Sequence, residues 1–186
     1  ADLTIIDNET SLGLATWGMP LATAIKDQTQ SDYFFTRFPA ELLSGCRKIT
    51  VFGGEPDPAG KWTMFWGDMS PRPSAAALAV LISKLWNAKP VGEFSLGKGD
   101  SIKLFETPEK RAVMVVSSSE RNGEEITLPA GSGELIVTDQ QGNERTLKEA
   151  ATHDLFLTAS PYFVEGRDLD VLKAQLVVQP AAGNSS

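Results

Sequence analysis

The sequence has few of the side chains that most often carry metal or nucleophilic chemistry. Among its 186 residues are one cysteine, Cys46, and one histidine, His153. A single cysteine cannot form an internal disulfide bond, and two such residues cannot supply the roughly four ligands of a structural zinc ion. A Ser-His-Asp or Cys-His catalytic arrangement would have to use His153, and a lone histidine is more typical of a structural hydrogen bond. We therefore expect no metal ion and no cofactor.

Long apolar runs and an excess of basic residues are also lacking. The longest apolar candidate, Ala75–Leu81, is too short for a membrane span, which takes about 18 residues. The chain has 24 acidic and 17 basic residues, a net charge of -7. Nucleic acids and anionic membrane surfaces both bind basic faces, so neither is an expected partner. The hydrophobic fraction of 41% is typical of a chain that folds around a core.

No targeting peptide is visible at the start of the sequence. The segment that starts at Ala1 has neither the basic start nor the apolar stretch of a signal peptide. An alanine with no preceding methionine indicates a mature or excised chain. Separately from this, we expect a secreted or periplasmic protein.

Residues 1–88 alternate between strand-like and helix-like segments. Strands are predicted at Leu12–Trp17 and Lys48–Phe52, and helices at Ser31–Ser44 and Ala75–Trp86. Thr63–Trp66 is expected to be a short strand or loop wall. This order is typical of a βαβ unit with parallel strands. A closed barrel of eight such units takes about 250 residues, so residues 1–88 predict a small βαβα layer that is at most a partial TIM barrel.

Residues 89–180 show the alternation with a period of two that is typical of strands. They predict an antiparallel β-sandwich, so the fold class is α+β. Ala112–Ser117 is apolar on both faces, which indicates a central strand. The predicted turns include Pro129–Gly131, Asp168–Val178 is expected to form one helical turn and a closing strand, and residues 181–186 are expected to be a disordered tail. The eight predicted strands are Val91–Leu96, Ile102–Glu106, Ala112–Ser117, Glu125–Leu128, Glu134–Thr138, Arg145–Lys148, Asp154–Thr158 and Tyr162–Val164.

Several segments match a known pattern. Leu14–Pro20, Cys46–Phe52 and Asp68–Ala77 resemble the end of a seventh barrel strand, an eighth strand and the opening of a last barrel helix. The family with these elements is the TIM-barrel retaining glycoside hydrolases, and their C-terminal β-sandwich is similar to later segments of this chain. The resemblance implies a C-terminal part of such an enzyme, with an oligo- or polysaccharide as ligand. It also implies the remainder of a barrel domain, or a second copy in a homo-oligomer, as a partner. The later segments are Arg111–Ser117, Ile126–Pro129, Val137–Asn143 and Leu157–Val164.

The sequence departs from this family at the catalytic positions. The residue that matches the family's nucleophilic glutamate is Thr16, whose hydroxyl cannot replace a carboxylate. The acid/base glutamate would lie on a fourth barrel strand, which this chain lacks. Retaining hydrolysis needs two carboxyl groups about 5–5.5 Å apart. We therefore expect an incomplete catalytic pair and assign no catalytic residue, and whether the chain is an enzyme stays open, since a shifted alignment would bring Glu9 or Glu55 to that position.

Five residues are candidates for contact with a glycan. Trp17, Trp62 and Trp66 lie at predicted strand ends or in loops, where an indole ring offers a flat apolar surface to the C–H face of a sugar. The alternative for all three is packing between the two parts of the chain. Glu55 and Asp57 follow a predicted strand and could bind sugar hydroxyls or transfer protons, unless they are ordinary turn residues. Trp86 is expected to be a core residue.

Two other functions fit the same sequence. One is a stand-alone carbohydrate-binding module, which predicts a monomer whose tryptophan fluorescence shifts with an oligosaccharide. The other is a non-catalytic structural or interaction module, which predicts no response to sugars. The enzyme portion predicts a dimeric or aggregation-prone chain, because its parallel strands lack neighbours.

Overall fold

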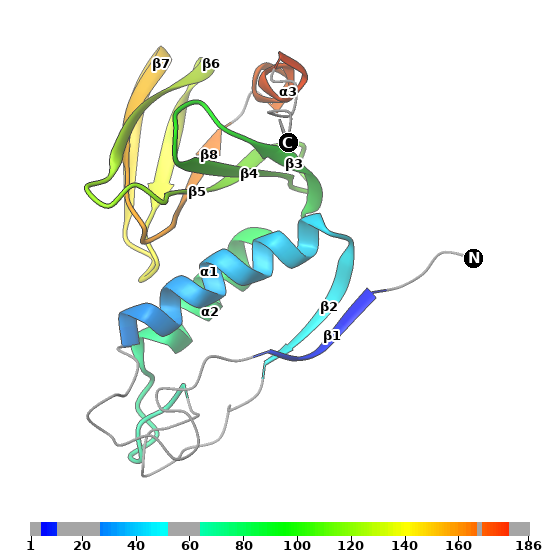
Figure 1. Ribbon diagram of the computed structural model, residues 1–186, viewed down its shortest axis with the longest axis vertical. Helices are drawn as coiled ribbons and strands as arrows, with labels where there is room; N and C mark the ends of the chain where they lie inside the picture. The colour runs from blue at the N-terminus through cyan, green and yellow to red at the C-terminus, as the bar shows by residue number, and fades with distance from the viewer. Residues whose placement is uncertain (1–4, 11–26, 52–63, 167–168, 179–186) are drawn as a thin grey trace, which may run out of the picture. The chain divides into compact units, whose positions relative to one another are not determined.

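The computed structural model describes residues 5–10, 27–51, 64–166 and 169–178, which form eight strands and three helices (Figure 1). Internal contacts divide the chain into two compact units. One comprises Ala1–Ser83 with Gln140–Gly142, and the other comprises Lys84–Asp139 with Asn143–Ser186. We describe the two units in turn.

The first unit contains a parallel pair of strands. β1 (Ile5–Thr10) pairs with β2 (Cys46–Val51), and α1 (Asp27–Leu43) lies between them in the chain. A helical connection is what parallel neighbours require, so the expected strand–helix–strand order is confirmed. The first strand precedes the predicted strand at Leu12–Trp17, all of which lies outside the described residues. Two parallel strands are described in this unit, so the predicted partial barrel is not shown.

α1 forms because its aromatic residues recur on one face. Phe34, Phe35 and Phe38 are at most 4% exposed, and the rings of Phe34 and Phe38 lie 5.4 Å apart. The helix begins four residues before the predicted start and ends, as expected, at a glycine. Gly45 has a φ of 96°, which favours glycine, and its N–H donates to the carbonyl of Leu42. Cys46 follows as the first residue of β2 and is 5% exposed, so it packs as a small buried hydrophobic residue.

α2 (Pro73–Leu85) buries one face and leaves the residue after it in solvent. Ala77, Leu81 and Leu85 recur every four residues and are at most 8% exposed. Trp86 comes one position after Leu85, about 100° further around the helix axis, and is 69% exposed. Asn87, with a φ of 55°, then ends the helix. The predicted core position of Trp86 is therefore wrong.

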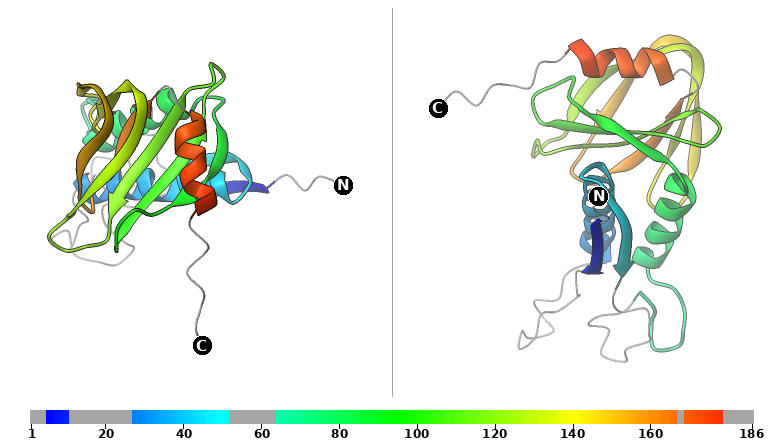
Figure 2. Two further views of the ribbon diagram at one scale, coloured as in Figure 1. Left: turned by 90° about the horizontal axis from the view of Figure 1, so that it is seen from above. Right: turned by 90° about the vertical axis from the view of Figure 1, so that its right-hand side faces the viewer.

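The second unit is built on one antiparallel sheet with the strand order β3-β4-β5-β8-β6-β7 (Figure 1). The predicted β-sandwich has two facing sheets, and the described residues show one that curls into a half-barrel (Figure 2). The difference arises because four strands that were predicted as short are joined into two long strands of 15 and 14 residues. Register shifts interrupt the pairing of these two strands, and bulges of this kind bend a sheet. The strands are β3 (Lys89–Phe94), β4 (Asp100–Glu106), β5 (Ala112–Ser118), β6 (Glu124–Thr138), β7 (Glu144–Leu157) and β8 (Tyr162–Gly166).

β6 passes through the predicted turn at Pro129–Gly131. Register shifts occur between Pro129 and Gly133 and again before Leu135. β8 pairs with Ile136–Thr138 of β6 alone among the described residues, so the first half of β6 has β7 as its neighbour on one side. Proline, which has no N–H, is tolerated on a strand with an open side. The predicted turn is therefore wrong.

The core of the second unit lies on one face of this sheet. β5 lies between β4 and β8, and every residue from Ala112 to Val116 is buried, which confirms the predicted central strand. α3 (Leu169–Val178) packs against the core through Leu169 and Leu172 (Figure 2). Burial of a leucine side chain contributes about 1.5–3 kcal/mol, which outweighs the strand preference of the valines nearby. The predicted closing strand in this segment is therefore wrong.

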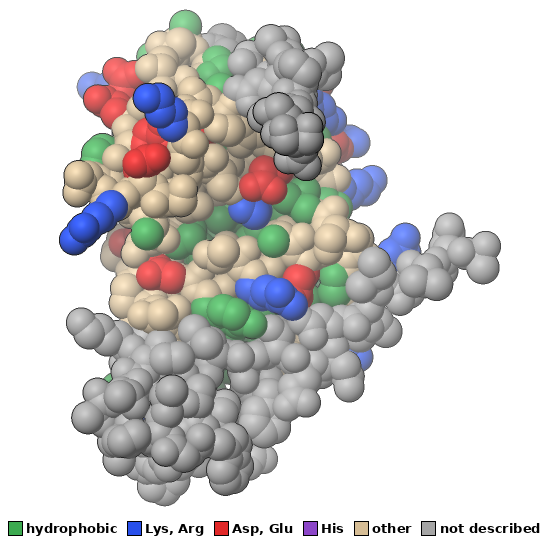
Figure 3. Space-filling model, viewed as in Figure 1, with side chains coloured by type: hydrophobic (Ala, Val, Ile, Leu, Met, Phe, Trp, Pro, Cys, Tyr) green, Lys and Arg blue, Asp and Glu red, His purple; other side chains and the backbone are tan. Residues whose placement is uncertain are grey.

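On the face shown in Figure 3, acidic and basic side chains are interspersed without a large patch of one sign. No helix in the described ranges is both long and apolar enough to cross a membrane. The predicted tail, residues 181–186, lies outside those ranges.

Candidate functional site

The structure describes one of the five candidate residues. Trp66 lies between β2 and α2, whereas Trp17, Trp62, Glu55 and Asp57 lie outside the described residues. Whether the five side chains come together therefore stays a prediction. Thr16, the residue at the expected nucleophile position, also lies outside them.

Trp66 belongs to a tight turn that we name the Trp66 turn, Met64–Arg72. Phe65 and Pro71 form a short antiparallel bridge across it. The backbone N–H of Trp66 donates to the carbonyl of Ser70 at 2.8 Å. These contacts close the turn on itself, so the backbone that carries Trp66 is held in place before α2 begins.

The tip of the turn is fixed by a carboxylate. Oδ1 of Asp68 accepts hydrogen bonds from the N–H of Ser70 at 3.0 Å and from its hydroxyl at 2.6 Å. These hydrogen bonds lower the pKa of Asp68. Both reach Oδ1, so Oδ2 is left as an acceptor at the solvent surface. Met69 completes the tip with a φ of 69° and a side chain that is 62% exposed.

The indole ring of Trp66 is stacked on a buried guanidinium group. Cζ of Arg72 lies 3.6 Å from the ring centroid, and the Arg72 side chain is 4% exposed. A cation–π contact with a desolvated arginine is worth about 2 kcal/mol. The Arg72 N–H donates to the Met64 carbonyl, and its own carbonyl accepts from Ala75 at the start of α2. Arg72 therefore covers one face of the indole, while Trp66 stays 43% exposed.

This arrangement is suited to binding a flat apolar surface. A rigid aromatic ring loses little entropy when a ligand stacks on it. Oδ2 of Asp68, two residues away, can accept a hydrogen bond from a ligand hydroxyl. The sequence indicated Trp66, but it did not indicate the supporting role of Arg72, for which the only signal was an arginine between two prolines at the start of a helix.

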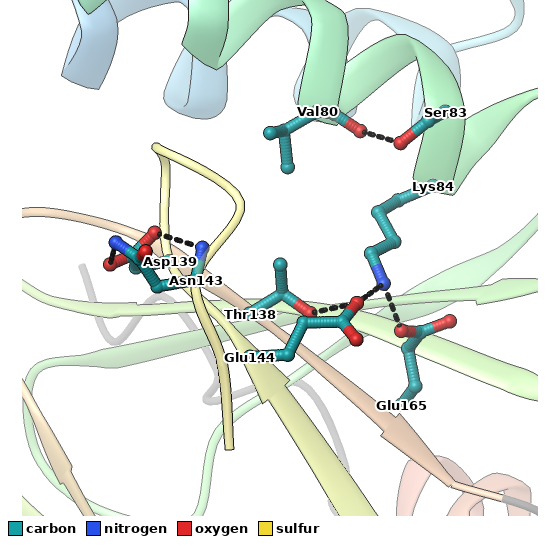
Figure 4. A network of polar contacts seen from close by, with 8 residues as sticks. All are labelled: Val80, Ser83, Lys84, Thr138, Asp139, Asn143, Glu144 and Glu165. Atoms are coloured by element: carbon teal, nitrogen blue, oxygen red, sulfur yellow. Dashed lines mark hydrogen bonds and ion pairs between the residues drawn. The ribbon is translucent and has the colours of Figure 1, made fainter.

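A second polar cluster lies in the other unit, at the last turn of α2 (Figure 4). Nζ of Lys84 lies 2.7 Å from Oε1 of Glu144 and 2.5 Å from Oε2 of Glu165. Burial would lower the pKa of Lys84, but hydrogen bonds and charges from both glutamates outweigh it and raise the pKa. The lysine also lowers the pKa of Glu144. Both carboxylates are therefore engaged by a structural lysine, and the cluster does not resemble an acid/base pair.

The described residues offer no metal site. They contain no group of three or more His, Cys, Asp or Glu side chains placed to hold an ion. The Asp139–Asn143 turn, whose oxygens could suggest calcium, is closed by its own side chains. Asn143 donates its backbone N–H and its side-chain amide to the two carboxylate oxygens of Asp139, at 2.9 and 2.8 Å.

Comparison with known proteins shows with which solved structures the chain shares its fold. No protein-family model and no curated protein matches the sequence. The chain is similar in structure to a family 39 glycoside hydrolase from the gut symbiont Bacteroides cellulosilyticus WH2, with a TM-score of 0.68 and 18% identity over 89% of this chain and 34% of that one. It is also similar to the catalytic domain of the GH30 xylanase C from Talaromyces cellulolyticus, with a TM-score of 0.56 and 13% identity over 89% of this chain and 41% of that one.

Both matches cover only part of the solved proteins. The chain spans about a third of the length of the first solved protein and two fifths of the second. Identities of 18% and 13% establish a shared fold and nothing finer. The expected resemblance is therefore confirmed at this level: the chain has a fold that is also found within glycoside hydrolases.

Proposed function

We propose that this chain is the C-terminal portion of a glycoside hydrolase, that it contributes a contact surface for an oligo- or polysaccharide, and that it lacks the full catalytic carboxylate pair. The similarity in fold to parts of two larger glycoside hydrolases supports the family relation. Thr16 at the expected nucleophile position supports the absence of the pair. A secreted or periplasmic location is part of the proposal, because a polysaccharide is too large to cross a membrane unaided.

The stacked ring of Trp66 is the observation that carries this proposal. The ring is 43% exposed and stacks on a guanidinium group at 3.6 Å, so part of its surface is accessible from solvent. The turn follows the parallel strand β2 in the chain and precedes α2. Loops after parallel strands carry the ligand sites of α/β proteins. This order supports a place for Trp66 at the edge of a glycan site.

The proposed partner is the remainder of a barrel domain, with a second copy of the chain as the alternative. All-parallel sheets occur almost only with both faces covered, and an uncovered strand edge is prone to association with another chain. The described residues of the first unit hold two parallel strands. Further strand–helix units would give this pair the neighbours that such sheets require.

Glycan retention by tryptophan variants tests the contact surface. We expect wild-type protein to be retarded in affinity electrophoresis through gels that contain soluble xylan or a β-glucan, and Trp66→Ala to lose roughly threefold to tenfold in affinity, which corresponds to one aromatic contact. Trp66→Phe keeps a ring above Arg72 and should retain part of the binding. Trp86→Ala removes a more exposed tryptophan outside the turn and is the matched control.

Two results would contradict the proposal. Equal retention of wild type and Trp66→Ala, with both variants folded by circular dichroism, would make Trp66 a packing residue. Turnover of aryl glycosides by the chain alone, abolished by Glu55→Gln, would show that the catalytic machinery is complete. We expect no turnover by the isolated chain.

A further inference from the structure

An aromatic ring stands exposed on the outer face of the β6–β7 hairpin. Phe156 is 58% exposed, whereas its neighbours Leu155 and Leu157 are 1% and 0% exposed. Successive side chains of a strand point to opposite faces. Phe156 therefore points away from the core that its two neighbours help to form.

The position of this ring is built into the local backbone. Gly123 has a φ of 78°, and a Cβ atom added there would lie 2.5 Å from Cζ of Phe156 and 2.7 Å from the carbonyl oxygen of Leu157. Only glycine leaves space for the ring beside this turn. The hydroxyl of Tyr162 donates to the carbonyl of Phe156 at 3.2 Å and gives this strand a further hydrogen bond. The ring therefore packs beside the turn at Gly123 and is not surrounded by solvent on every side.

Oxygen acceptors surround the ring on the same face. Glu125 lies directly opposite Phe156 in the register of the hairpin, and Thr127 lies opposite Asp154. Positions two apart share a face, and opposite side chains have Cβ atoms about 4.5–5.5 Å apart. The Thr127 hydroxyl donates to Oδ1 of Asp154 at 2.8 Å, which leaves Oδ2 as an acceptor. We name these four residues, Glu125, Thr127, Asp154 and Phe156, the Phe156 face.

We infer that the Phe156 face is a second saccharide-binding site, separate from the Trp66 turn. A sugar offers an apolar C–H face to the phenyl ring, and its hydroxyl groups donate to the carboxylates of Glu125 and Asp154. An anionic ligand would be repelled by the two acids. The inference rests on the proposed function, because the glycoside hydrolase fold is the reason to choose a saccharide over a cation as the ligand.

Site-resolved NMR on the full chain tests this inference. Xylohexaose and a β-glucan hexasaccharide are titrated into 15N-labelled protein, and the amide signals of residues 123–127 and 153–157 are followed. We expect saturable shifts there, a loss of roughly threefold to tenfold in affinity at these signals in Phe156→Ala, and near-normal affinity in Phe156→Tyr, because one aromatic contact is removed or kept. Trp86→Ala is the control, since it removes an exposed ring of the same unit outside this face. Binding should persist in about 0.5 M salt, because the ligand is uncharged.

The outcomes separate this inference from the proposed function. Shifts in the hairpin that survive Trp66→Ala and vanish in Phe156→Ala support a second site. Shifts confined to the Trp66 turn overturn the second site and leave the proposed function standing. Shifts confined to the hairpin support this inference and overturn the role of Trp66. An absence of shifts with every saccharide, or binding that salt removes, overturns the inference.

Discussion

Removal of the Lys84 ammonium group should destabilise the second unit, and the size of the loss should depend on how deeply its glutamate partners are buried. Lys84→Met keeps the apolar stem and leaves Glu165 without the lysine that it contacts at 2.5 Å. Breaking a buried ion pair costs about 3–5 kcal/mol, and an exposed one at most about 1 kcal/mol. The Lys84 and Glu165 side chains are 15% and 13% exposed, so this pair lies nearer the buried limit. We expect a loss of about 2–3 kcal/mol, or a melting temperature lower by about 5–10 °C.

The second glutamate provides the contrast. Glu144 contacts the same ammonium group at 2.7 Å, but its side chain is 53% exposed. Water can solvate this carboxylate when the lysine is absent, so Glu144→Gln should cost less than about 1 kcal/mol. The same logic predicts that Lys84→Met combined with Glu165→Leu recovers most of the lost stability, because no buried charge is left.

Urea unfolding of five proteins, followed by circular dichroism, measures these differences: the wild type, Lys84→Met, Glu144→Gln, Glu165→Leu and the double variant. The double variant should be more stable than the sum of the single changes by at least about 1 kcal/mol. The pKa of Lys84 is raised above its ordinary value of 10.5, so the contribution of the cluster should be complete below that pH and disappear as the pH rises through the folded-state value. Equal losses for Lys84→Met and Glu144→Gln, or simple additivity in the double variant, would refute the argument from burial.

Two further predictions concern a turn and an acid-sensitive carboxylate. Gly123→Ala should destabilise the protein by about 1–3 kcal/mol, because Gly123 has a positive φ and the new Cβ would lie 2.7 Å from the carbonyl oxygen of Leu157. Gly142→Ala is the control: Gly142 has a φ of 87°, but the atom nearest to its new Cβ lies at 3.3 Å, so this change should cost less in the same melting assay. Hydrogen bonds from Lys110 and Lys173 lower the pKa of Glu106 from 4.5 to about 2. The contribution of Glu106 to stability is therefore present above pH 4.5 and lost as the pH falls toward 2. Glu106→Gln should make the melting temperature depend less on pH over that interval. An unchanged pH dependence in the variant would contradict this prediction.

Some elements could be predicted because local signals and tertiary packing agree. The helix expected at Ala75–Trp86 is found at Pro73–Leu85, since strong helix formers, a proline at the first position and an apolar face all favour it. The strand expected at Ala112–Ser117 is one residue longer and central, as its two apolar faces indicated. In both segments the fold buries residues of the apolar sequence pattern, so the local pattern was enough to predict the element.

Other elements depended on contacts that a local pattern does not contain. Pro129 and Gly131 are typical of a turn, but the open side of β6 tolerates them within a strand. Lys84 and its partners lie 60 and 81 residues apart, so their cluster has no sequence signature. The candidate site was predicted through Trp66, because an indole ring at a strand end or in a loop offers a flat surface to a sugar. Arg72, which stacks on that ring, lies where any helix could begin, so the sequence did not single it out.

The half-barrel of the second unit has an open edge, because the first half of β6 pairs with β7 alone among the strands that the structure describes. That part of the hairpin is held by side chains such as Ile126, Leu128, Leu155 and Leu157, which are at most 3% exposed. Apolar packing lacks the directionality of a backbone ladder, so this portion can separate from the rest as one piece while the ladder between β6 and β7 stays intact. Amide protons along the outer border of β6 should therefore exchange with solvent together, ahead of those in β5.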